Sequence, residues 1–284
     1  MKKIFLLIPV LVFAVFVNAS AFGSRYADTT RKHNWKLVWS DEFNYSGLPD
    51  QSKWNYEEGF VRNHEKEYYT KARKENAVVK DGFLYITGIK EHCRNAAYKA
   101  GSTGWETKDS VADYTSASIN TQGKASWKYG KIEVRAKLPS GNGVWPAIWM
   151  LGDNISKKGW PECGEIDIME NVGFEPRNVY ATMHYLDPVT QKHGSNGKHT
   201  ESATLSTGFH IYTLEWDKKE IRVYLDSTLY QTFNVDNAGK GRHNGFRHKQ
   251  YLLLNLALGG DWGGRIDDSI FPQQYVVDYV RVYQ

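Results

Sequence analysis

A series of short apolar or alternating segments, separated by turn signals, runs along almost the whole chain, and helical periodicity is nearly absent. Residues 77–90 form two such segments around Asp81-Gly82, a dipeptide typical of a β-hairpin turn. Many short strands at this spacing predict an all-β fold, an antiparallel sandwich of two sheets. The other segments are residues 131–138, 179–185, 210–216, 220–226, 228–235, 251–258 and 275–283.

The N-terminus has the features of a secretory signal peptide. Lys2 and Lys3 precede an apolar stretch at residues 4–17, and small residues follow it. This stretch is shorter than the roughly 20 residues of a membrane span, although an uncleaved anchor remains the alternative. We therefore expect a signal peptide at 1–21, a single domain at 22–284, no membrane span in the mature chain, and a secreted or periplasmic protein. No cysteine stands beside the stretch to carry a lipid.

The charge balance argues against nucleic acid and membrane surfaces as partners. The whole chain carries a formal net charge of +4, and residues 1–21 contain two lysines and no acid, so the mature chain keeps only +2. No run of Lys or Arg forms a basic footprint. The sequence also lacks linkers and repeats, and we expect a monomer.

Aromatic residues make up 14% of the chain, including ten tryptophans. Trp145, Trp160 and Trp262 stand beside Gly or Pro in expected loops. Sugar rings have apolar faces and a polar perimeter, so exposed aromatic side chains among amides and carboxylates suit them. Burial in the core is the alternative for each single tryptophan.

Three acids lie in the short segment GEIDIME: Glu165, Asp167 and Glu170. Strand alternation puts Glu165 and Asp167 on one face but Glu170 on the other. A β-bulge between Asp167 and Glu170 would bring all three to one face, with the outer Cα atoms about 13 Å apart. Glutamate side chains that lean together from a curved sheet could then reach the roughly 5–5.5 Å between carboxyl groups that retaining glycosidases use.

Retaining glycoside hydrolysis needs an ionised carboxylate to attack the anomeric carbon and a protonated carboxyl group to donate to the leaving oxygen. An acid between them couples to both, because close like charges do not all ionise. A calcium site and a solvated strand face remain the alternatives for this cluster.

At this point the sequence resembles glycoside hydrolase family 16, and among its members the laminarinases. The signature is WPECGEIDIMENVG at residues 160–173, in the bulged Glu-x-Asp-x-x-Glu form. Further blocks match in the same order along the mature chain: LVWSDEFN at 37–44, WNYEEG at 54–59, NHEKEYYT at 63–70, ENAVVKDGFLYIT at 75–87, residues 114–152, YLLLNLALGGDWGG at 251–264 and FPQQYVVDYVRVYQ at 271–284.

The resemblance implies a β-jelly-roll sandwich with a substrate cleft on its concave sheet. It makes Glu165 the nucleophile, Asp167 the helper acid and Glu170 the general acid/base, and it places His184 near Glu170. Catalysis by these groups needs no cofactor. The residues expected to bind substrate are Trp145, Trp149, Trp160, Trp262, His184, Asn63 and Arg73.

The implied activity is endo-hydrolysis of β-1,3-glucan or of mixed β-1,3-1,4-glucan. Three alternatives remain: a galactanase of the agarase or carrageenase type, a transglycosylase, and a non-catalytic glucan-binding lectin on the same fold. The loops that decide specificity include residues 186–205, for which the sequence predicts no structure.

Two further expectations concern stability. Asp278 stands two positions from Val276 and from Val280, so strand alternation predicts that all three side chains point into the core. A carboxylate in the core needs a partner. The resemblance offers a structural calcium ion held by Asp278 with backbone oxygens near Glu42 and Gly82; a hydrogen bond or an arginine partner is the alternative. Cys93 and Cys163 could form a disulfide in an exported protein or stay unpaired.

Overall fold

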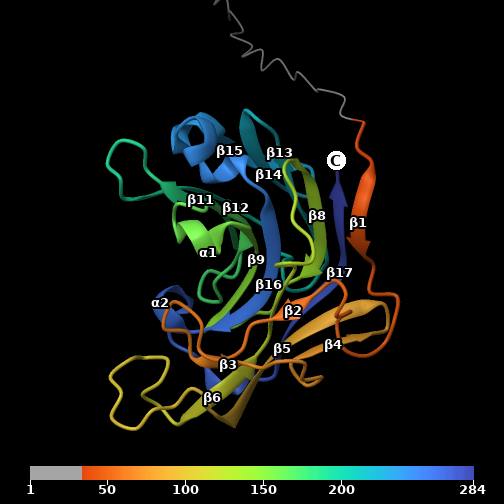
Figure 1. Ribbon diagram of the computed structural model, residues 1–284. Helices are drawn as coiled ribbons and strands as arrows, with labels where there is room; N and C mark the ends of the chain where they lie inside the picture. Colours follow the sequence, from red (N-terminus) through yellow and green to blue (C-terminus); the bar gives the residue numbers. More distant parts are fainter. Residues whose placement is uncertain (1–33) are drawn as a thin grey trace, which may run out of the picture. The chain divides into compact units, whose positions relative to one another are not determined.

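Two sheets pack face to face in the computed structural model, which describes residues 34–284 (Figure 1). The back sheet has ten strands in the order β15-β14-β13-β8-β17-β5-β6-β3, with β1 beside β17 and β4 beside β5. Its bounds are β1 (Leu37–Asp41), β3 (Glu67–Tyr69), β4 (Ala77–Lys80), β5 (Phe83–Arg94), β6 (Val111–Ser116), β8 (Gly130–Lys137), β13 (His210–Trp216), β14 (Glu220–Leu225), β15 (Thr228–Asn234) and β17 (Gln273–Tyr283).

The site sheet has seven strands in the order β12-β11-β10-β9-β16-β7-β2. Strand pairs are antiparallel in both sheets except for β3 and β6. The bounds are β2 (Asn55–Tyr56), β7 (Ser118–Asn120), β9 (Val144–Gly152), β10 (Glu165–Glu170), β11 (Asn178–Leu186), β12 (His193–Glu201) and β16 (Gln250–Leu258). The short helices are α1 (Ile155–Lys158), α2 (Gly260–Gly263), η1 (Val235–Ala238), η2 (Gly241–His243), η3 (Gly245–Arg247) and η4 (Asp268–Ile270).

The main hydrophobic core lies between the two sheets. Every second residue of β8 faces it, as in Ile132 and Val134, and the facing side chains of β16 include Leu254. Full burial of such side chains contributes about 1.5–3 kcal/mol each. Strands β9 and β16 are buried on both faces, because side chains cover their second face as well. This accounts for their continuous apolar sequences.

The predicted all-β sandwich is therefore confirmed. The predicted hairpin is confirmed too: Lys80 pairs with Phe83, and the turn residues Asp81 and Gly82 have φ of 54° and 81°. Positive φ at both central residues is typical of a type I′ turn, which explains why Asp-Gly stands there.

Strand β12 is an element that the sequence did not predict. It pairs with β11 over its whole length, from Leu186 opposite His193 to Asn178 opposite Glu201. As the edge of the site sheet it contains no apolar residue, and most of its side chains are exposed. Apolar alternation, the signal used for the other strands, is therefore missing here.

The inward direction predicted for Asp278 is wrong. The register of β17 shifts between Val277 and Tyr279, so the strand bulges at Asp278. Odd-numbered residues face the core before the bulge and even-numbered residues face it after the bulge. Val277 and Val280 are fully buried, whereas the Asp278 side chain is partly exposed and forms an ion pair with Arg135 of β8.

The two cysteines do not form a disulfide. Cys163 is buried and Cys93 is partly exposed on β5, and both thiols are free. The predicted signal peptide lies outside the described residues. Within residues 34–284 no helix is long and apolar enough to cross a membrane.

Candidate active site

Strand β10 carries the bulge that the spacing of its acids predicted. Asp167 pairs with Thr182 of β11, yet the next pair is Glu170 with Tyr180, so one extra residue stands on β10. The consecutive residues Ile168 and Met169 are both fully buried in the core between the sheets. The extra residue brings Glu170 to the same face of the sheet as Glu165 and Asp167, and all three acids line the same hollow.

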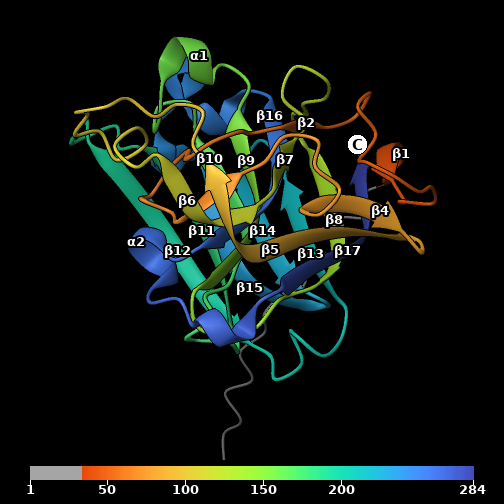
Figure 2. The same ribbon diagram turned by 90° about the horizontal axis from the view of Figure 1, so that it is seen from below.

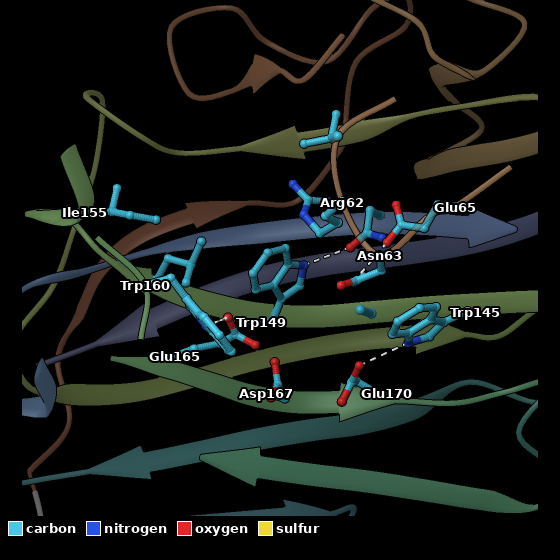
Figure 3. Close-up of a pocket in the computed structure, with 14 residues that line it drawn as sticks. Arg62, Asn63, Glu65, Trp145, Trp149, Ile155, Trp160, Glu165, Asp167 and Glu170 are labelled. Carbon is cyan, nitrogen blue, oxygen red and sulfur yellow. Dashed lines mark hydrogen bonds between the residues drawn. The ribbon is translucent and has the colours of Figure 1, made fainter. Parts of the chain in front are cut away.

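The hollow has a volume of about 430 Å³ and lies on the outer face of the site sheet. Figure 3 shows Glu165 near Trp160 at one end, Glu170 near Trp145 at the other, and Asp167 between them. Trp149 lines the hollow opposite the acids. The structure thus brings three predicted tryptophans together with the three acids.

Each outer glutamate accepts a hydrogen bond from a tryptophan. Trp160 Nε1 donates to Glu165 Oε2 over 2.8 Å, and Trp145 Nε1 donates to Glu170 Oε1 over 3.0 Å. Trp160 is half exposed, whereas Trp145 is 9% exposed. The tryptophans therefore have two functions here: they supply ring surface to the hollow, and each fixes one oxygen of a glutamate.

His184 lies nearer to Glu165 than the resemblance implied. It stands opposite Glu165 in the register of β10 and β11, and its Nε2 is 3.2 Å from Asp167 Oδ2 and 3.8 Å from Glu165 Oε1. Its Nδ1 is 2.8 Å from Nε2 of His193 on β12, and the His193 ring lies 4.5 Å from the Trp160 ring. Sequence analysis missed His193 because it lies in the segment that could not be placed.

Burial raises the pKa of all three acids, since a charged carboxylate loses water there. The negative charge of Asp167 raises the pKa of Glu165 and Glu170 further. The positive charge of His184 and the Trp160 N–H act in the opposite direction on the pKa of Glu165. The pKa of Glu170 is held well above its usual value. Glu170 is therefore suited to hold a proton, whereas the donors around Glu165 only partly offset the rise of its pKa, to about 8.

A hydrogen-bonded chain forms the wall opposite the acids. Trp149 Nε1 donates to Asn255 Oδ1 over 2.8 Å, and Asn255 Nδ2 donates to the Tyr69 hydroxyl over 3.0 Å. The Tyr69 hydroxyl donates to Glu65 Oε2, and Asn63 Nδ2 reaches Glu65 Oε1 at 3.2 Å. Asn63 also lines the hollow, and its contact with substrate stays a prediction. Asn255 was missed, although a single amide inside the apolar run of β16 is a usable signal.

Arg62 also lines the hollow, and its guanidinium lies 4.9 Å from the Trp149 ring centroid. Two predicted substrate-binding residues lie elsewhere. Arg73 donates to both carboxylate oxygens of Glu91, at 2.6 and 3.0 Å, and does not line the hollow. Trp262 packs edge-on against Trp145 at 5.5 Å and supports that ring from outside the hollow.

Within residues 34–284, two places are candidates for metal ligation. Glu165, Asp167 and His184 each bring one ligand atom within 4.8 Å of the others, although the same spacing suits proton exchange between acids and an imidazole. At the second place, β17 pairs with β5 up to Val277 and with β1 from Val280, so the segments of Gly82 and Glu42 meet near Asp278. The Asp278 carboxylate there has Arg135 as its partner, and the Glu42 carboxylate has Arg281.

Comparison with known proteins agrees with this geometry. The model of glycosyl hydrolases family 16 matches residues 64–281. A beta-glucanase of Rhodothermus marinus is 44% identical over an alignment of 285 positions, gaps included, which covers 95% of this chain and 92% of the relative. The X-ray structure of the laminarinase from the same organism has a TM-score of 0.76 at 43% identity and covers 89% of this chain and 99% of that chain.

A second solved structure concerns the endo-acting O-glycanases that prominent members of the human gut microbiota express to initiate mucin breakdown. It has a TM-score of 0.83 at 38% identity and covers 89% of this chain and 92% of that chain. The family match spans most of the chain and includes the bulged acid strand. The membership that the motifs predicted is thereby confirmed: the chain belongs to glycosyl hydrolases family 16.

Proposed function

We propose that the protein is a retaining endo-β-glucanase that cleaves β-1,3-glucan or mixed β-1,3-1,4-glucan. The observation that carries this proposal is the bulged strand β10, which presents Glu165, Asp167 and Glu170 to one tryptophan-lined hollow. Both Rhodothermus relatives carry names of glucan-degrading enzymes, beta-glucanase and laminarinase. Glucose rings can stack on the indole rings that line the hollow. The three acids then lie along the glycan chain that crosses it.

In the first step, Glu165 attacks the anomeric carbon and the glycosidic C–O bond breaks. Glu170 donates its proton to the leaving oxygen, so a glycosyl ester on Glu165 and a free saccharide result. The raised pKa of Glu170 keeps that proton available, while Trp145 fixes the oxygen Oε1 and leaves Oε2 for the transfer.

In the second step, Glu170 is ionised and accepts a proton from water, and the water oxygen attacks the anomeric carbon. The ester bond to Glu165 breaks and the carboxylate is restored. Asp167 is 2% exposed between the two glutamates, and its charge raises the pKa of both. Burial raises the pKa of Asp167 itself to about 8, and when Asp167 is ionised its charge favours return of a proton to Glu170.

A second candidate substrate is a mucin-type O-glycan. The O-glycanase structure has the higher TM-score, 0.83 against 0.76 for the laminarinase, despite its lower identity. The two candidates share the acids of β10 and differ in the sugars that the hollow must accept. Loops around the hollow decide between them.

We also propose that the protein acts outside the cytoplasm, in the periplasm or secreted, as a monomer. The support is the signal-peptide pattern at residues 1–21 and the sugar polymer proposed as substrate.

A substrate panel tests the activity. Laminarin, lichenan, mixed-linkage β-glucan, agarose, carrageenan and mucin O-glycans are incubated with the enzyme, and new reducing ends and product sizes are measured. We expect oligosaccharides of several sizes from the glucans, as endo-cleavage requires. Cleavage of mucin glycans or galactans alone would replace the glucanase proposal, and binding without cleavage of any polymer would identify a lectin.

The pH dependence tests the charge balance around the nucleophile. His184→Gln removes a positive charge that lowers the pKa of Glu165, so that pKa rises and less Glu165 is ionised at acidic pH. The acidic limb of kcat/KM against pH should move to higher pH. His199→Gln is the matched control, because His199 lies on the same sheet beside Tyr180, and its profile should stay unchanged. An acidic limb that stays in place or moves down in His184→Gln contradicts the assignment.

We propose in addition that calcium binds at Asp278 with backbone oxygens of the Glu42 and Gly82 segments and ties β17 to its neighbours. The ion would take the place of Arg135 at the carboxylate. A chelator should then lower the melting temperature of the wild type, and Asp278→Asn should abolish this response. An unchanged wild-type melting temperature removes calcium from the account.

A further inference from the structure

A second hollow of about 550 Å³ adjoins the active-site hollow, and Glu65 lines both of them. One wall is the segment of residues 60–66, which also supplies Asn63 to the active site. The opposite wall comes from the connection between β5 and β6, a loop at residues 95–110 that projects beyond β6 in Figures 1 and 2. The mechanism above makes no use of this loop.

The loop has a fixed shape although it contains no strand. The side chain of Asn95 is 2% exposed, and its Nδ2 donates to the carbonyl oxygens of Glu106 and Asp109 at 2.8 and 2.9 Å. The hydroxyls of Ser102 and Thr107 lie 2.6 Å apart and close the far half of the loop. A buried amide that bonds both arms of a loop makes it a preformed wall, not a flexible excursion.

Trp105 fixes this loop to the rim of the active site. Its ring packs edge-to-face against Phe60 at 6.1 Å and lies 5.2 Å from the His64 ring. His64 Nδ1 in turn lies 2.9 Å from Asp261 Oδ1, next to the tryptophan that supports Trp145. Trp105 is only partly buried and lines the second hollow, so part of its ring area faces the hollow.

The second hollow has side chains of both charge signs. Lys66 and Lys108 line it together with Asp109 and Asp113, and all four side chains are exposed. Glu65, whose pKa burial raises, adds a carboxyl group to this mixed lining, so hydroxyl groups find both donors and acceptors there. An aromatic ring with polar groups around it is the environment that suits a neutral sugar ring.

We propose that the second hollow is an additional subsite, in which Trp105 binds a neutral sugar unit of the same glycan whose scissile bond lies between Glu165 and Glu170. This rests on the proposed function, since the occupant is the distal part of the substrate chain. Glu65 joins the two hollows, so a long chain occupies both and a short one occupies only the first. The subsite makes the enzyme prefer long substrates.

The test compares kcat/KM for β-1,3-linked gluco-oligosaccharides of increasing length. In the wild type, kcat/KM should rise with length beyond the units that the first hollow holds. Trp105→Ala should leave the shortest cleaved oligosaccharide unchanged and reduce kcat/KM for the longest about tenfold, the worth of one aromatic contact. Trp105→Phe keeps a ring at this place and should retain most of the gain with length.

Asn95→Ala loosens the loop without touching the ring and should reproduce the loss for long substrates. Melting temperatures of the variants check that the fold persists. The subsite is overturned if Trp105→Ala lowers kcat/KM equally at every length, or leaves the gain with length intact. Failure of the wild type to cleave any of the oligosaccharides is a separate result, which overturns the glucanase proposal and with it the chain that the subsite would hold.

Discussion

The active site depends on one irregularity: two consecutive residues of β10, Ile168 and Met169, both point into the core between the sheets. A regular strand would turn Glu170 inward, where a carboxylate without a partner is costly. Ile168 would face the core in a regular strand as well, so the bulge adds the burial of Met169, about 1.5–3 kcal/mol, in place of Glu170. The packing of the sandwich and the placement of the acids thus share one cause.

Three acids in one hollow repel one another, and their surroundings make this arrangement useful. Indole N–H groups from Trp160 and Trp145 bind the outer glutamates, and His184 brings positive charge to the side of Glu165. Both glutamates have a raised pKa, and the donors around Glu165 oppose the rise there, so the environments of the two differ. A pair of acids in unlike environments is what acid-assisted nucleophilic attack requires.

Sequence reasoning predicted the sandwich, the bulge and the three acids because each leaves a local pattern. Alternation of apolar and polar residues indicates half-buried strands. The three acids of β10 can share one face of the sheet only if the strand bulges. It missed β12, an edge strand without apolar residues, and therefore His193. It misplaced Asp278 because a bulge on β17 reverses which residues face the core, and no feature of the sequence indicates that bulge. Arg73 was assigned by resemblance alone, and its pairing with Glu91 depends on tertiary contacts.

The sharpest test of the account separates the roles of the two outer glutamates. Glu165→Ala and Glu170→Ala are each assayed with an activated β-glycoside in the presence of azide, and the anomeric configuration of the glycosyl azide is determined by NMR. The account predicts an inverted, α-configured azide from Glu165→Ala, because azide enters the space of the nucleophile. It predicts a retained, β-configured azide from Glu170→Ala, because the glycosyl ester on Glu165 still forms. The opposite pair of configurations would contradict it.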